Sequence, residues 1–184
     1  MKNRYLPLVL VASLLLLIGS VAAGCGGDDD NGNGGGEPLT LDAWFGQLET
    51  LSQAYDDDLD TLDEEAEANF GKTDSEDEAI EVFVSFVEDM RSATDDFVGD
   101  LDDLSAPSEV AADHSEAVTA GQEVVSLYGD ALTVLDLAET FEDATLVLEG
   151  PGFVDAQDRF SAACVALQDF ADSSGIDVDL SCPS

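Results

Sequence analysis

Residues 41–62 read LDAWFGQLETLSQAYDDDLDTL, and this stretch decides the fold class. Its apolar side chains recur three or four residues apart, at Leu41, Trp44, Phe45, Leu48, Leu51, Tyr55, Leu59 and Leu62. Such spacing places side chains on one face of an α-helix. Thr40, directly before the stretch, is a residue type that caps helix N-termini. The pattern predicts an amphipathic helix from Leu41 to about Phe70, which ends at Gly71.

The same spacing recurs in three further stretches, which run from about 75 to 104, from 110 to 135 and from 153 to 175. The segment 139–149 is open to two interpretations, because it either extends the third helix or forms a separate short turn. Long amphipathic helices joined by short connections are typical of helix bundles. The sequence therefore predicts an all-α fold, an antiparallel four-helix bundle.

The C-terminal tail, residues 176–182, alternates apolar and acidic side chains, so we expect one of its faces to be buried in a groove. Two cysteines, Cys164 and Cys182, lie around it. A cysteine pair in an exported chain predicts a disulfide, which would staple the tail to the fourth helix. A metal site lacks partners because the single histidine is far away in the sequence, and redox catalysis favours Cys-x-x-Cys spacing.

The N-terminus has the layout of a secretory signal, with a basic head at Lys2 and Arg4 and an apolar run over residues 8–18. The closing residues, Val21-Ala-Ala-Gly-Cys25, resemble the lipobox of bacterial lipoproteins, in which the cysteine receives a diacylglyceryl group. An ordinary cleaved signal or an uncleaved anchor would be the alternatives, and all three interpretations export the chain. We expect a signal peptide over 1–24, a flexible Gly/Asp-rich tether over 25–38 and a domain over 39–184.

The composition is strongly acidic, with 42 Asp and Glu against 5 Lys and Arg and a net charge of −37. Nucleic-acid binding needs a basic surface, so that class of function is excluded. The same charge opposes adhesion to an anionic membrane, so the lipid is expected to be the only membrane contact, with mobile cations around the domain. Asp56–Asp58 and Asp102–Asp103 are weak cation-site candidates, but consecutive helical residues point in different directions, which favours solvated charge.

Two other stretches carry a resemblance to known proteins. The pattern Cys164-Val-Ala-Leu-Gln168, followed by Ala171-Asp172, Gly175-Ile-Asp-Val-Asp-Leu180 and Cys182, is similar to the C-terminal end of a group of small acidic bacterial lipoproteins. The turn Leu101-Asp-Asp-Leu-Ser-Ala-Pro-Ser-Glu109 that leads to His114 is similar too. The resemblance implies a helical domain with a stapled tail, and it implies no activity.

His114 and Tyr128, on the apolar stripe of the third helix, form a weak candidate polar site. A lone histidine on such a stripe is more often a hydrogen-bonded core residue than a ligand or a base, and the chain has no metalloprotease, nucleophile-elbow or P-loop motif. We therefore expect no enzyme, no cofactor and no resident metal. The predicted function is binding or structural: a lipid-anchored protein on the extracytoplasmic face of the cell membrane, with an envelope protein as a possible partner. The alternatives are a cation-buffering surface protein and, less favoured, an enzyme or a small-ligand carrier that uses the bundle interior.

Overall fold

The computed structural model describes residues 39–135 and 137–182, and these residues are mostly helical. The helices in chain order are α2 (Leu41–Phe70), α3 (Glu76–Asp103), α4 (Ala111–Leu135), α5 (Phe141–Leu146), the 3₁₀-helix η1 (Val147–Glu149) and α6 (Pro151–Ser174). No strand occurs within the described ranges. The predicted all-α class is confirmed. The expected signal peptide, the tether and Cys25 lie outside the described residues.

Local side-chain chemistry fixes the ends of the long helices. Thr40 accepts a hydrogen bond from the backbone N–H of Ala43 at 3.3 Å, and so caps α2 as predicted. Ser75 caps α3 in the same way through the N–H of Glu78, at 3.2 Å. Helix α6 begins with proline and ends at Gly175, whose φ of 75° lies in the left-handed region that glycine adopts without strain.

The segment left open by the sequence is a separate short element and does not extend α4. Thr140 accepts a hydrogen bond from the N–H of Asp143 at 3.1 Å and starts α5. The backbone N–H of Phe141 also donates to the carboxylate of Glu76 at 3.0 Å, which ties α5 to the first turn of α3. This long-range contact supplements the local cap.

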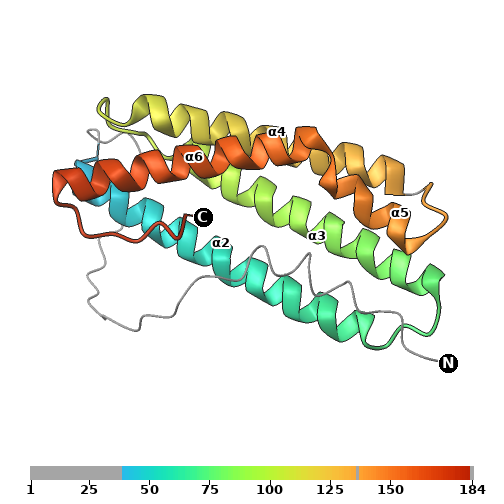
Figure 1. The fold of residues 1–184 in the computed structure, drawn as a ribbon. Coiled ribbons are helices and arrows are strands. Elements are labelled where there is room, and N and C mark those ends of the chain that lie inside the picture. Colours follow the sequence, from blue (N-terminus) through green and yellow to red (C-terminus); the bar gives the residue numbers. More distant parts are fainter. Residues whose placement is uncertain (1–38, 136, 183–184) are drawn as a thin grey trace. The chain divides into compact units, whose positions relative to one another are not determined.

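The four long helices lie side by side (Figure 1). The closely packed pairs are α2 with α3, α3 with α4, and α4 with α6, while α5 lies against α3. Helices α2 and α6 are not among the closely packed pairs. The C-terminal tail runs between these two helices in Figure 1, so chain outside the helices occupies part of this side.

The core has two parts along the helices. The part that we call the tail-side core includes Trp44, Phe45, Leu48, Val98, Leu101, Val110, Val118, Leu167 and Leu180. The part that we call the α5-side core includes Phe83, Val87, Met90, Val124, Tyr128, Leu135, Ala144 and Phe153. Because each part draws on several helices, burial of these side chains holds the helices together.

Gly121 is a place where α4 approaches its neighbours closely. A Cβ at this position would lie 2.5 Å from Cγ2 of Val98 and 3.4 Å from Cε2 of Phe160. Valine has essentially one rotamer in a helix and cannot swing away. We expect Gly121→Ala to lower the free energy of unfolding by about 1 kcal/mol, because overpacking of ~1–3 kcal/mol exceeds the ~1 kcal/mol gain in helix propensity.

The matched control is Gly99→Ala on an exposed part of α3, where an added Cβ meets nothing within 4 Å. This change is expected to raise the free energy of unfolding by ~0.5–1 kcal/mol through helix propensity alone. Urea denaturation followed by circular dichroism measures both variants. Equal stability of the two would contradict the close approach at Gly121.

Candidate functional site

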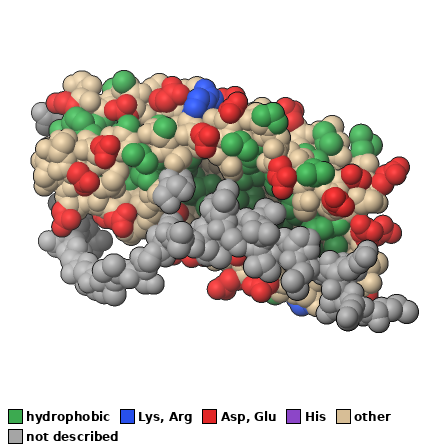
Figure 2. Space-filling model, viewed as in Figure 1, with side chains coloured by type: hydrophobic (Ala, Val, Ile, Leu, Met, Phe, Trp, Pro, Cys, Tyr) green, Lys and Arg blue, Asp and Glu red, His purple; other side chains and the backbone are tan. Residues whose placement is uncertain are grey.

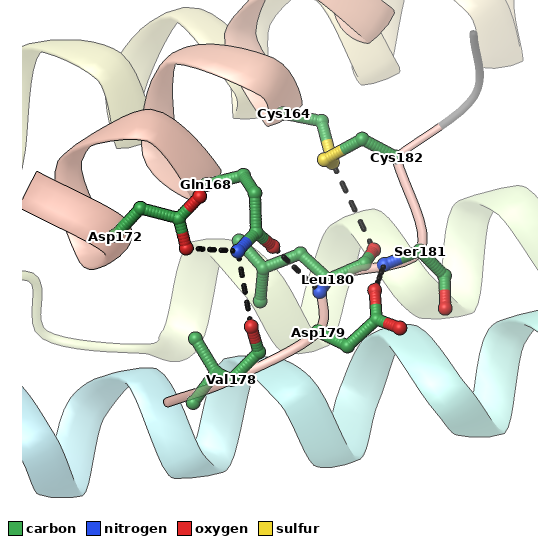
Figure 3. The surroundings of a disulfide bond; sticks show 8 residues. All are labelled: Cys164, Gln168, Asp172, Val178, Asp179, Leu180, Ser181 and Cys182. Atoms are coloured by element: carbon green, nitrogen blue, oxygen red, sulfur yellow. Dashed lines mark hydrogen bonds between the residues drawn. A yellow bond between two sulfur atoms is a disulfide. The ribbon is translucent and has the colours of Figure 1, made fainter. Parts of the chain in front are cut away.

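Side chains of both α2 and α6 hold the C-terminal tail, and Figure 3 shows those of α6. On α6, Gln168 uses both ends of its amide: its Nε2 donates to the carbonyl of Val178 at 3.0 Å, and its Oε1 accepts from the N–H of Leu180 at 2.9 Å. On α2, the carboxylate of Glu49 accepts the N–H of Asp179 at 2.9 Å. The tail is therefore held through its backbone, as an extended peptide is held in a binding groove.

The tail also carries apolar anchors and a covalent bond. Leu180 is 3% exposed in the tail-side core, and Ile176 and Val178 pack against the same core. Cys164 and Cys182 form a disulfide, with their Cα atoms 5.6 Å apart. Both the predicted disulfide and the predicted burial of one tail face are therefore present.

A row of carboxylates runs along the side of α2 that faces the tail. We call Glu49, Asp56, Asp60, Asp63 and Glu67 the acidic row, since steps of seven, four, three and four residues return to one face of a helix. Glu49 holds the tail backbone, and Asp56 accepts a hydrogen bond from the side chain of Ser181. The other three members lie further along α2 than Glu49 and Asp56, which contact the described part of the tail. The described residues contain one ion pair, which joins Arg159 of α6 to Glu123 of α4. No member of the acidic row takes part in it.

Burial and neighbouring negative charges raise the pKa values of two members of the row. Burial raises the pKa of the Asp56 carboxyl, as do the charges of Asp60 and Asp57, although the hydrogen bond from Ser181 acts in the opposite direction. Burial also raises the pKa of Asp63, and the charges of Glu67 and Asp60 add to the effect. Both carboxylates are therefore ionised at some cost in the folded chain.

These raised pKa values predict how stability depends on pH. A carboxyl group whose pKa is higher in the folded than in the unfolded state stabilises the fold when protonated, and this contribution is lost as pH rises through the folded pKa. We expect the melting temperature to rise as pH is lowered from about 7 towards the ordinary Asp pKa of ~3.9. The double variant Asp56→Asn/Asp63→Asn should melt higher at pH 7 and show a flatter pH profile.

The control for this prediction is Asp58→Asn/Glu64→Gln, which removes two charges from exposed positions of the same helix that are not among the causes of the raised pKa of Asp56 or Asp63. Melting curves followed by circular dichroism, from about pH 4 near the ordinary Asp pKa up to about pH 7, compare the two variants. If the control flattens the profile as much as the first pair does, the effect is general charge repulsion and not these two carboxyls.

Two tyrosines bring polar groups into the interior. The hydroxyl of Tyr55 on α2 lies 3.0 Å from Oγ1 of Thr94 on α3, and burial raises the pKa of this phenol. Tyr128 on α4 is 5% exposed, packs edge-on against Phe153 of α6 with ring centroids 4.8 Å apart, and has its pKa raised by burial and by the nearby Tyr55. Its hydroxyl makes no hydrogen bond to the described residues. Tyr128 therefore contacts α6 through Phe153 and lies close enough to Tyr55 on α2 for that group to affect its pKa.

His114 and Tyr128 do not meet at one site. His114 is 9% exposed, with Nε2 2.8 Å from the backbone carbonyl of Leu101, at the end of α3. Its ring packs edge-on against Trp44, with centroids 5.7 Å apart, in the tail-side core. Tyr128 belongs to the α5-side core. In this position the histidine joins α4 to the end of α3, and none of the described carboxylates is hydrogen-bonded to it.

Sequence reasoning did not find the residues that hold the tail. Glu49 and Gln168 occupy ordinary polar positions on two helices distant in sequence, and their role depends on how these helices flank the tail. The four-and-three spacing of Asp56, Asp60 and Asp63 was the available signal for the acidic row.

The described residues contain neither a candidate metal site nor a candidate membrane span. No group of three or more His, Cys, Asp or Glu side chains in this part of the chain could hold a metal ion. None of the described helices is both long and apolar enough to be a membrane span.

Comparison with protein-family models, with curated proteins and with solved structures gives no match for this chain.

Proposed function

We propose that this protein is a lipid-anchored binding protein of the bacterial envelope, whose extracytoplasmic domain is an antiparallel four-helix bundle. The anchor is the lipidated Cys25, and the tether of residues 25–38 spaces the domain from the membrane. The partner is an envelope protein, and the lipid is the only contact with the bilayer. The close packing of consecutive long helices supports the bundle arrangement.

The observation that carries this proposal is the Cys164–Cys182 disulfide. Structural disulfides belong to oxidising compartments outside the cytoplasm, which agrees with the export signal and with the cysteine at its end. Two independent features, one near each end of the chain, thus support the same location.

A binding role is favoured over catalysis by the way the interior polar groups are used. Thr94 donates to the carbonyl of Met90 at 2.7 Å and meets Tyr55, while His114 bonds to Leu101. The Tyr55–Thr94 and His114–Leu101 contacts join helices, and the Thr94–Met90 bond lies within α3. These groups do not converge on a common cavity with a nucleophile or a charged base.

The test is metabolic labelling of the bacterial host with a radioactive fatty acid, followed by membrane fractionation. Cells whose outer layer has been opened, but whose cell membrane is intact, are also treated with a protease. We expect the native chain to carry the fatty-acid label and the variant Cys25→Ser to carry none. The added protease should digest the domain from outside the cell membrane. Label that persists in Cys25→Ser, or a domain that resists external protease, would overturn the proposal.

A cation-buffering coat remains the second candidate because the acidic row concentrates negative charge. We expect the melting temperature to rise with salt, and sodium and calcium chloride to act alike at matched ionic strength, since screening depends on ionic strength alone. Differential scanning calorimetry of the chain from residue 26 onward measures this. A saturable, calcium-specific rise would instead identify a defined cation site and would contradict a coat whose charge is only screened.

A further inference from the structure

A groove lies between the end of α2 and the beginning of α3, beside the turn that joins the two helices. Its volume is about 390 Å³, which is within the range of small-molecule sites. The less exposed residues of its lining are apolar, with Ala66 buried and Leu62, Val82 and Phe86 half-buried. Leu62 and Phe86 also pack against the α5-side core. An occupant therefore meets an apolar floor that is continuous with the core.

The exposed rim of the groove carries four carboxylates, which belong to Glu65 of α2 and to Glu78, Glu81 and Asp89 of α3. None of the four forms an ion pair with another described residue. From Glu78 to Asp89 the rim extends about 16 Å, at 1.5 Å per residue. The described carboxylates do not gather into a group that could hold a metal ion. The positive charges that match this rim must therefore be spread along the groove.

The only lysine among the described residues lies in this groove. Lys72 lines it from the turn after α2, and its Nζ donates to Oδ1 of Asn69 at 3.1 Å without an ion pair to the four carboxylates. A lysine side chain is an alkyl chain that ends in an ammonium group, so the groove already accommodates this chemistry. One ammonium against four carboxylates leaves the described lining with three uncompensated negative charges.

We propose that this groove binds a linear polyamine, a molecule in which ammonium groups alternate with short methylene chains. The methylene chains cover the floor at Leu62 and Phe86, and the ammonium groups meet carboxylates of both helices. A divalent metal ion has no apolar body and carries its charge at one point, and a neutral apolar molecule leaves the carboxylates unpaired. The site is separate from the lipid anchor and from the tail, so the inference goes beyond the binding role proposed above.

Charge alone does not single out the groove. Asp and Glu side chains are scattered over the face of the molecule drawn in Figure 2. A chain with a net charge of −37 also attracts polyamines by diffuse association, which salt weakens. The test must therefore separate the groove from the rest of the surface, by stoichiometry and by matched variants.

The test is calorimetric titration of spermidine into the chain from residue 26 onward at about 0.15 M salt, which screens the diffuse attraction. We expect saturable binding of one spermidine per chain. Glu65→Gln/Asp89→Asn removes one carboxylate from each side of the groove and should weaken binding about tenfold. The matched control Glu64→Gln/Asp96→Asn removes the same charge from exposed positions of the same two helices outside the groove. It should change the affinity less than about twofold.

Three further variants leave every carboxylate in place. Ser85→Phe fills the groove from an exposed position of its lining and should abolish binding, whereas Ser92→Phe, at an exposed position of α3 outside the groove, should not. Lys72→Gln removes the resident ammonium group and should strengthen binding about threefold. Circular dichroism verifies that each variant folds.

Four outcomes would overturn the inference. These are the absence of binding, unsaturable uptake of several spermidines per chain, equal weakening by the two charge pairs, and binding that Ser85→Phe leaves unchanged. Unsaturable uptake or equal weakening would assign the polyamine to the diffuse charge of the surface.

Discussion

Reduction of the Cys164–Cys182 disulfide is expected to lower the free energy of unfolding by about 3 kcal/mol. The two residues are 18 apart in sequence, so the bond closes a ring whose loss returns considerable freedom to the unfolded chain. The bond also holds a tail with few anchors of its own, chiefly Leu180 and the backbone bonds to Gln168 and Glu49. Urea denaturation with and without a reductant, and of the variant Cys182→Ser, measures the effect.

A matched variant separates the covalent bond from the polar contacts of the tail. Gln168→Ala removes both amide contacts to the tail while the disulfide stays, and we expect it to cost about 1–2 kcal/mol. Hydrogen exchange at the N–H of Leu180 should accelerate in both cases, and most in the reduced chain. A reduced chain that keeps both its stability and the protection of Leu180 would show that the disulfide does not hold the tail.

The sequence was sufficient for the helices because their positions depend on local patterns. The spacing of Leu48, Tyr55 and Leu62, the cap at Thr40 and the stop at Gly71 all act within a few residues. The segment 139–149 could not be settled in this way, since α5 is fixed partly by a hydrogen bond from Phe141 to Glu76, 65 residues earlier. Local periodicity carries no information on such a contact.

The candidate site was predictable only in part, for a related reason. The alternation in the tail indicated a buried face, and Cys164 and Cys182 indicated the staple. Which helices flank the tail depends on tertiary packing, so the roles of Glu49 and Gln168 could not be inferred. His114 and Tyr128 lie on the same apolar stripe of α4. That stripe passes through both parts of the core, so the two residues lie in different parts and do not meet.

The largest effect of a single substitution is expected at Trp44, which supports the end of the molecule where the tail is seated. Its side chain is 0% exposed and packs edge-on against both Phe45 and His114, with ring centroids 5.0 Å and 5.7 Å away. Trp44→Ala should lower the free energy of unfolding by about 3–5 kcal/mol, because it removes this apolar area and leaves a cavity. Urea denaturation must be followed by circular dichroism, since this is the only tryptophan of the chain.

Trp44→Phe should lower the free energy of unfolding much less than Trp44→Ala, because it also removes the indole N–H. Nε1 of Trp44 is buried and makes no hydrogen bond with any described residue, so the native side chain carries a desolvation penalty of about 1–3 kcal/mol. Phenylalanine keeps most of the ring contacts and removes the unpaired donor, so the two effects partly offset each other and the net loss should stay below about 2 kcal/mol. If Trp44→Phe were as destabilising as Trp44→Ala, the N–H would have to bond to a buried group such as a water molecule. The core at this end would then depend on a polar contact as well as on packing.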